Sequence, residues 1–233
     1  MSTYLNYLNQ ISSEKTFLRK INYVRYNFGH YLLSKKETGT FLEIGPGLGH
    51  AIKFLNSKGV NKIDIVDNDD SILNYIKENF EINKLYKTDN IKEIDTQLDH
   101  YDVIIATQVF EHIPKEQYRS FLTTLYKHLN KNGYLIITVP NMANPFTLCE
   151  RYGDITHTNG FTDNSLIELA AMSEIPVSSI MVRAYKIPPY SLLNIIRIFF
   201  QKILHLALLA MSIINAGSYS KLLTPNISLV IKK

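Results

Sequence analysis

The segment that decides the fold runs from Phe41 to Gly49 and reads FLEIGPGLG. Its first four residues, with Thr40 before them, predict a short buried strand, and the glycines that follow predict a tight turn into a helix. Because glycine has no Cβ, the backbone at Gly45 and Gly47 can turn sharply and let a ligand lie against it. The free amides at the start of the next helix point to the same place. The segment therefore predicts a ligand-binding turn between a strand and a helix.

Strand and helix patterns alternate along the rest of the chain. The expected strands are 40–44, 62–66, 84–87, 101–106, 134–139, 177–186 and 227–233. Helical patterns separate them, at about 71–79, from 114 to about 129, and at 162–174. Such alternation predicts an α/β fold with a doubly wound, mostly parallel sheet of seven strands.

Composition restricts the class of protein. A chain of 233 residues, 45% hydrophobic and 20% charged, is typical of one globular domain. The net charge is +4 and the lysines are scattered, which argues against a nucleic-acid partner. One cysteine, Cys149, excludes an internal disulfide framework, and the first residues lack the pattern of a signal peptide. We therefore expect a cytoplasmic protein.

Four successive strands end in polar side chains. Glu43 stands two residues before the first glycine, Asp67 ends the second strand, Asp89 follows the third and Gln108 follows the fourth. Open α/β sheets bind ligands at the carboxyl ends of their strands. A carboxylate at Asp67 can accept hydrogen bonds from both hydroxyls of a ribose, and an acid at Asp89 can reach an adenine amino group. Each acid alone is as well explained as a helix cap, but the four together favour a nucleoside ligand.

The glycine spacing distinguishes between nucleoside ligands. The spacing here is G-x-G-x-G, whereas dinucleotide-binding folds use G-x-G-x-x-G, which disfavours an NAD-dependent or nucleotide-sugar dehydrogenase. The carboxylate of Glu43 would repel a diphosphate, but it is compatible with a cationic sulfonium amino acid.

Four segments resemble the class I S-adenosylmethionine (SAM)-dependent methyltransferases motif by motif. They are FLEIGPGLGH at 41–50, IVDND at 65–69, KTDN at 87–90 and VIIATQVFEHIP at 103–114. The resemblance implies a sheet order of 3-2-1-4-5-7-6 with an antiparallel seventh strand. The residues expected to bind SAM are Glu43, Gly45, Pro46, Gly47, Gly49, Asp67, Asn68, Asp89, Asn90 and Gln108.

A later segment narrows the resemblance. Residues 139–166, VPNMANPFTLCERYGDITHTNGFTDNSL, are similar to a stretch in bacterial methyltransferases of surface-glycan biosynthesis, in O-antigen and capsule clusters. The resemblance implies an O-methyltransferase for a sugar or glycan precursor of a surface polysaccharide. Relatives commonly have a glycine before strand six, whereas this chain has Ser173-Glu174-Ile175, which puts the end of the preceding helix in doubt. Alternatives are another small acceptor (a phosphate-type oxygen of a capsule unit, or a quinone or lipid precursor) and a SAM-binding protein without activity.

Methyl transfer to a sugar hydroxyl gains from a positioned base, most often histidine. His157 is the expected base, with Asp154 orienting it or binding the acceptor; the alternative is a structural histidine bonded to a loop carbonyl. His112 and Glu111 are expected to have a role at the start of a helix, and no metal is expected. The residues expected to bind the acceptor are Tyr23, Tyr26, Arg151 and Tyr152.

A long apolar segment, Leu192 to Ala216, is interrupted by Arg197, Lys202 and His205. Its longest uninterrupted stretch, 206–216, is shorter than the ~20 residues that a membrane span needs. Asn194, Arg197, Gln201 and His205 recur at helical spacing and form a narrow polar stripe. We expect a helix that packs on the protein as a lid or forms a homodimer; peripheral membrane contact is the less favoured alternative.

The chain is expected to be a single methyltransferase domain over 1–233. Its expected parts are an N-terminal helical cap at 1–38, a SAM-binding core at 39–140, an acceptor-side segment at 141–186, an apolar helical insertion at 187–226 and a last strand at 227–233.

Overall fold

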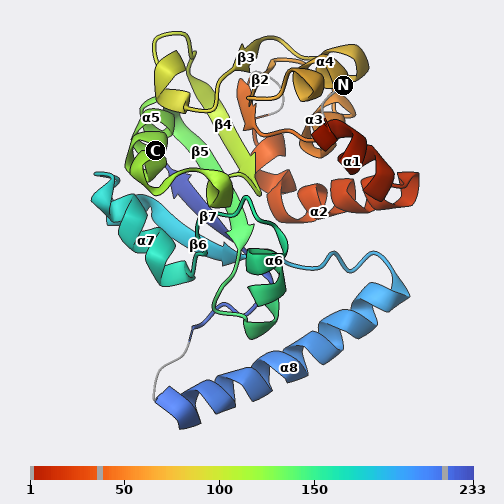
Figure 1. Ribbon diagram of the computed structural model, residues 1–233, viewed down its shortest axis with the longest axis vertical. Helices are drawn as coiled ribbons and strands as arrows, with labels where there is room; N and C mark the ends of the chain where they lie inside the picture. Colours follow the sequence, from red (N-terminus) through yellow and green to blue (C-terminus); the bar gives the residue numbers. More distant parts are fainter. Residues whose placement is uncertain (1–2, 36–38, 217–219) are drawn as a thin grey trace.

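The computed structural model describes residues 3–35, 39–216 and 220–233, and a seven-stranded sheet forms its centre (Figure 1). The strands are β1 (Phe41–Ile44), β2 (Ile63–Asp67), β3 (Leu85–Lys87), β4 (Tyr101–Thr107), β5 (Leu129–Pro140), β6 (Ile180–Ala184) and β7 (Asn226–Lys232). Their order is β3-β2-β1-β4-β5-β7-β6, and β7 alone runs antiparallel to its neighbours β5 and β6. The predicted fold class, strand order and antiparallel last strand are confirmed.

Helices cover both faces of the sheet. In the described residues the α-helices are α1 (Thr3–Ile11), α2 (Glu14–Leu33), α3 (His50–Asn56), α4 (Asp70–Asn79), α5 (Tyr118–Lys127), α6 (Leu148–Gly153), α7 (Asp163–Met172) and α8 (Leu192–Ala216). One core cluster packs α2, α3 and α4 against the sheet, and a second packs α5 and α7 against the opposite face. The middle of β4, 103–106, is apolar because alternate residues serve both clusters: Val103 and Ile105 face the first, and Ile104 faces the second.

Some boundaries differ from the prediction, among them the start of β6 and the end of α7 at Met172. Strand β6 begins at Ile180 instead of residue 177, because the 3-10 turn η5 (Val177–Ser179) comes before it. Helix α7 starts as predicted, at the cap residue Thr162, whose hydroxyl accepts a hydrogen bond from the backbone of Ser165. At the far end, Glu174 has a φ of 63°, a left-handed conformation that glycine adopts at less cost. This chain therefore has Glu174 in a strained backbone conformation that the glycine of its relatives would adopt without strain.

The glycine-rich turn has the geometry that its sequence predicts. Gly45, Gly47 and Gly49 have φ values of 64°, 52° and 77°. A Cβ at Gly49 would lie 2.6 Å from the ring of Phe80, and one at Gly45 would lie 2.4 Å from a methyl group of Val109. The turn therefore needs glycine both for its backbone conformation and for its close packing.

The variant Gly49→Ala is expected to destabilise the fold by about 2–4 kcal/mol, from the left-handed backbone and the overlap with Phe80. Gly59→Ala is the matched control, because Gly59 also has a φ of 77° but has no atom within 4 Å of the added Cβ. It should lose only about 1–2 kcal/mol. Urea unfolding of both variants measures the difference, and equal losses would show that the contact with Phe80 contributes nothing.

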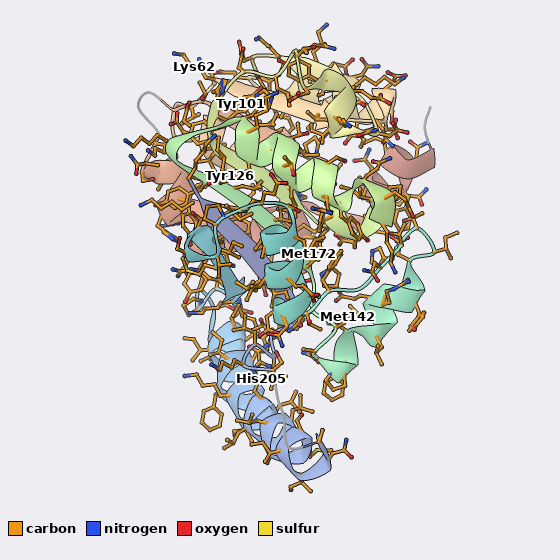
Figure 2. The ribbon with its side chains drawn as sticks, turned by 90° about the vertical axis from the view of Figure 1, so that its left-hand side faces the viewer. Lys62, Tyr101, Tyr126, Met142, Met172 and His205 are labelled. Carbon is orange, nitrogen blue, oxygen red and sulfur yellow. The ribbon has the colours of Figure 1, made fainter. Side chains whose placement is uncertain are left out.

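The expected N-terminal cap consists of α1 and α2, and residues 1–2 and 36–38 of its expected range lie outside the described residues. Helix α8 is the insertion between β6 and β7. Residues 217–219 of the expected insertion also lie outside the described residues. The helix has the predicted bounds, but no residue in it is buried. Figures 1 and 2 show α8 extending away from the rest of the molecule. The expected burial of α8 against the body is therefore wrong.

By length and composition, α8 could also cross a membrane: it has 25 residues and a mean hydropathy of 1.6 over its most apolar window. The interruptions by Arg197 and Lys202 therefore do not by themselves exclude a span, contrary to the sequence argument.

Candidate active site

A cleft of about 1200 Å³ opens at the carboxyl ends of the strands. The predicted residues that line it are Tyr23, Glu43, Gly45, Pro46, Gly47, Asp67, Asn68, Asp89, Gln108 and Asp154. They come from the ends of β1 to β4, from α2 and from the loop after α6. Because β1 and β4 are neighbours while their helices lie on opposite faces, the cleft lies at the switch point where α/β sheets bind ligands.

Glu43 lies at the bottom of the cofactor half of the cleft. Its side chain is buried, and its Oε2 atom has no hydrogen-bond partner among the described residues. Burial raises the pKa of Glu43 to about 8. A buried carboxyl oxygen without a partner is costly, so an ammonium or sulfonium cation beside it would relieve that cost. At Gly47, beside it, an added Cβ would have no neighbouring atom closer than 4.0 Å, so the turn leaves space there. These residues fit the methionine end of SAM.

Asp67 occupies the position expected of a ribose ligand. Its Oδ1 accepts a hydrogen bond from the backbone N–H of Asp69 at 2.9 Å. Burial raises the pKa of Asp67 to about 6, and the hydrogen bond from Asp69 lowers it in part. Asp89 lines the cleft beyond Asp67, at the end of β3. The ends of β2 and β3 therefore place two carboxyl groups where the nucleoside of SAM would lie.

Three predicted cofactor residues have other structural roles. The side chain of Asn90 accepts a hydrogen bond from the backbone of Lys92 and caps the 3-10 turn η1 (Ile91–Ile94), so it does not line the cleft. Gly49 is the N-cap of α3 and supports the turn from behind. Gln108 lines the cleft with a φ of 56°, a strained conformation for a residue with a side chain, and its amide donates to the side chain of Asn226 at 3.2 Å.

The acceptor half of the cleft lies over β4 and β5, where two segments meet. The 3-10 turn η2 (Phe110–His112) carries His112, and the loop after α6 carries Asp154 and Thr156. The Thr156 hydroxyl donates to Asp154 Oδ1 at 2.6 Å and lies 2.8 Å from His112 Nδ1. His157 lies beside them, with its Nε2 atom 4.0 Å from Asp154 Oδ2. The structure therefore brings the predicted pair, Asp154 and His157, together.

His112 is part of this group as well. The sequence favoured a role for it at the start of a helix, but its ring lies 4.7 Å from that of His157 and lines the cleft. His157 itself is not among the residues that line the cleft, and its side chain is 9% exposed. Its ring is therefore reached from the cleft past His112 and Asp154.

The expected acceptor-binding residues divide into two groups. Tyr23 lines the cleft and stacks on Tyr185 with ring centroids 5.7 Å apart. Tyr26 instead packs edge-on against Tyr190, outside the cleft lining. Tyr152 is 77% exposed and does not line the cleft.

Arg151 also has a structural position. Its guanidinium donates to the backbone carbonyl of His157 at 2.8 Å and to that of Thr158 at 3.4 Å. A second bond, from the Thr158 backbone N–H to the Glu111 carbonyl at 2.8 Å, ties this loop to η2. Arg151 therefore holds the loop that carries His157 and does not line the cleft.

Several residues that line the cleft were missed by the sequence argument. They are Arg19, Lys20, His50, Glu150, Arg197 and Gln201. Arg19 and Lys20 lie on α2 and supply positive charge opposite Glu43, which suits the carboxylate of an amino acid. No local motif marks them, because α2 reaches the cleft only by packing on α3. Arg197 and Gln201 belong to the polar stripe of α8, whose helical spacing was the available signal.

The comparisons with known proteins agree with this geometry. A family model described as a methyltransferase domain matches residues 18–171, so the chain belongs to that family. The protein is therefore a methyltransferase whose methyl donor is SAM. A comparison with curated proteins gives no match.

Solved structures show the same fold. A SAM-dependent methyltransferase from Archaeoglobus fulgidus is 17% identical, with both chains covered at 100% and a TM-score of 0.68. The plantazolicin methyltransferase BpumL, solved with S-adenosylhomocysteine, is 18% identical over 98% of this chain and 88% of its own, with a TM-score of 0.58. A possible histamine N-methyltransferase from Thermotoga maritima is 14% identical over 99% and 97% of the chains, with a TM-score of 0.57.

Proposed function

We propose that the protein transfers the methyl group of SAM to a hydroxyl oxygen of a sugar or glycan precursor. The observation that carries the proposal is the lining of the acceptor half. Side chains that can exchange hydrogen bonds with several hydroxyls surround it, among them Gln117, Glu150, Asp154 and Gln201. The stacked pair Tyr23 and Tyr185 offers an aromatic face beside them. A hydroxyl-rich ring with one apolar face matches both features.

The charges in the cleft discriminate between acceptors. Glu150 and Asp154 line the acceptor half, and Glu111 is buried beside it. The carboxyl groups of Glu150 and Asp154 disfavour an anionic phosphate oxygen as the acceptor, by like-charge repulsion. A quinone precursor would leave many of these polar groups without partners, which is costly in a desolvated site. The segment from 139 to 166, similar to that of glycan methyltransferases, agrees with a sugar.

Methyl transfer from a sulfonium is a direct displacement, and the protein contributes by holding the acceptor oxygen in line with the methyl group and excluding water. In this proposal, the SAM residues at β1 to β3 hold the donor. The group at Asp154, Thr156 and His157 receives the acceptor hydroxyl and its proton.

The test is release of S-adenosylhomocysteine by the purified protein when nucleotide sugars, lipid-linked sugars, phenols and quinone precursors are supplied in turn. Release with a sugar acceptor, together with a mass gain of one methyl group on that sugar, is the expected result. Turnover with phenols or quinone precursors alone would overturn the glycan proposal. A protein that binds SAM but turns over no acceptor would indicate a SAM-binding protein without activity.

A further inference from the structure

A group of metal-ligating side chains lies beside the acceptor half of the cleft. Glu111, His112 and His157 each place one ligand atom within 4.8 Å of the other two. Two ligands on opposite sides of a cation are at most about 4.2 Å apart, at bond lengths near 2.1 Å. In the tetrahedral arrangement of Zn²⁺ sites the separation is about 3.4 Å, so closing the group around a cation requires side-chain shifts of up to about 0.7 Å each.

The carboxyl group of Glu111 has no other partner. Glu111 is 1% exposed, and neither carboxyl oxygen has a hydrogen-bond partner among the described residues. An unpartnered carboxyl at this depth is costly in either protonation state.

The hydrogen bonds of His112 leave its other nitrogen free to bind a metal. The single hydroxyl proton of Thr156 is donated to Asp154 at 2.6 Å, so Thr156 must accept from His112 Nδ1–H at 2.8 Å. The lone pair of His112 is then on Nε2. A histidine that donates one N–H to an oxygen and presents the other nitrogen is the usual arrangement of a metal ligand. Asp154 supports His112 indirectly, because it accepts the hydrogen bond that orients the Thr156 hydroxyl.

We propose that Glu111, His112 and His157 bind one divalent transition-metal cation of the Zn²⁺ class. Two imidazoles favour such a cation over Mg²⁺ or Ca²⁺, which prefer oxygen ligands. Three protein ligands leave coordination positions open, as in catalytic sites. This proposal replaces the metal-free scheme expected from the sequence.

The role of the cation rests on the proposed function, whereas its binding does not. A bound cation would lower the pKa of an acceptor hydroxyl at an open position, and Asp154 would accept its proton. The acceptor oxygen then forms the O–CH₃ bond as the S–CH₃ bond breaks, and the sulfur keeps the electron pair as a neutral thioether. No oxidant or reductant takes part.

Titration of metal-depleted protein with Co²⁺ tests the binding, because Co²⁺ stands in for Zn²⁺ and its visible absorption reports coordination. We expect one Co²⁺ per chain, displaced by Zn²⁺ but not by equal Mg²⁺. Glu111→Gln and His157→Ala should weaken binding by roughly 10- to 100-fold or more. The controls Glu116→Gln and His100→Ala replace exposed residues outside the group and should bind Co²⁺ as the wild type does.

Calorimetry with S-adenosylhomocysteine shows that each variant is folded, since Glu111 and His157 are not cofactor ligands. Absence of Co²⁺ binding by the wild type, or equal binding by Glu111→Gln, would overturn the site. If a sugar acceptor is found, chelation should abolish its methylation and Zn²⁺ should restore it. Methylation that continues after chelation would overturn the role in the reaction. If no acceptor is found, the Co²⁺ result still decides whether the site exists.

A second, independent observation concerns α8, whose amphipathic pattern is inverted. Its polar stripe is directed toward the body, where Arg197 and Gln201 line the cleft. Its large apolar side chains are directed outward, and the most exposed of them include Leu192, Leu193, Phe199, Leu206, Met211 and Ile214. A surface of this size is unusual on a soluble monomer, and it marks an interaction site.

The sheet prevents α8 from crossing a membrane. The strand before it, β6, pairs with the strand after it, β7, so both ends of α8 must lie on one side. Three residues separate its last residue from Ser220, whose hydroxyl donates to Asp163 on the body at 3.2 Å. The four Cα–Cα steps between them reach only about 14 Å, less than a return across the bilayer.

Charge distinguishes a lipid surface from a second copy of the chain. Residues 186–221, which are α8 and the segments that flank it, contain four basic residues (Lys186, Arg197, Lys202 and Lys221) and no aspartate or glutamate. Two such segments facing each other would bring like charges together. An anionic lipid surface would instead attract them while the apolar side chains enter the acyl boundary.

We infer that α8 lies flat in the interface of an anionic bilayer, which leaves the acceptor half of the cleft beside the membrane. Under the proposed function, the acceptor is then a lipid-linked sugar, because such an acceptor reaches the cleft along the surface that α8 occupies. Arg197 and Gln201 would contact it from the inner side of the helix.

Cosedimentation with vesicles tests the membrane contact. The wild type should pellet with phosphatidylcholine–phosphatidylglycerol vesicles and much less with phosphatidylcholine alone. Phe199→Glu and Leu206→Glu should each lower partitioning by roughly tenfold or more. Val177→Glu places the same charge at another exposed apolar residue, on η5, and should partition as the wild type does.

Light scattering without lipid provides the second measurement, which is the oligomeric state of the protein. A wild-type dimer that these α8 variants convert to a monomer, without vesicle binding, would overturn the inference in favour of a second copy.

Discussion

Replacing His157 by alanine should lower the rate of methyl transfer by about 10²–10⁴-fold and leave SAM affinity nearly unchanged. The reason is its place in the cleft: His157 lies with Asp154 and His112 over β4 and β5, whereas the residues that fit SAM follow β1 to β3. Single-turnover kinetics with saturating SAM measures the chemical step, and calorimetry measures cofactor affinity.

His100→Ala is the matched control, since His100 is an exposed histidine outside the cleft lining and should leave the rate unchanged. If His157→Ala keeps activity within a few-fold of the wild type, His157 is a structural histidine and the reaction depends on Asp154 or water. A parallel loss of SAM affinity would instead show that the loop around His157 supports the cofactor half.

Replacing Asp67 by alanine should weaken SAM binding by about 10- to 150-fold, the equivalent of 1.5–3 kcal/mol for hydrogen bonds to a charged group. Asp67 ends β2 at the cleft, where its carboxylate can accept from both ribose hydroxyls. Asp99→Ala, at an exposed acid paired with Lys84, is the control and should bind SAM normally. Unchanged affinity in the Asp67 variant would remove this residue from the cofactor site.

The same residue predicts a dependence on pH. Burial raises the pKa of Asp67 to about 6, and the ionised form is the one that accepts both hydrogen bonds. SAM affinity should therefore be full above pH 7 and fall as the pH drops through 6. Asp67→Ala should lack that part of the dependence. Calorimetry at several pH values compares the two proteins.

Much of the cofactor half could be predicted from the sequence because it is built from local pattern. In the strand and turn at Phe41 to Gly49, the residue types themselves determine the conformation. The apolar residues favour a buried strand, and the glycines that follow allow the left-handed backbone of the turn. Glu43, Asp67 and Asp89 needed only the rule that parallel strands present their carboxyl ends on one side. The strand order followed from the family resemblance, and the structure confirms it.

The acceptor half was less predictable because it depends on contacts between distant segments. Residue type and spacing marked Arg151 and Tyr26 as acceptor ligands, yet Arg151 holds loop carbonyls and Tyr26 packs on Tyr190. His112 reads locally as the start of a helix, and its second role exists only because His157, 45 positions later, lies against it. The pattern of residues within one segment does not predict a contact between two distant segments.

The sequence alone determined the class of fold, the glycine turn and the bounds of the apolar helix α8, since each depends on interactions between residues near one another in the chain. Only the tertiary structure decided which way α8 faces and what stands around Glu111. The sequence predicted an apolar helix and assumed that its apolar side would be buried, as in most proteins. In the structure, β6 and β7 hold the two ends of α8 on the sheet while its polar stripe lies toward the cleft. The apolar side chains therefore face outward, because the orientation of a helix is set by what its ends are attached to as well as by its own pattern.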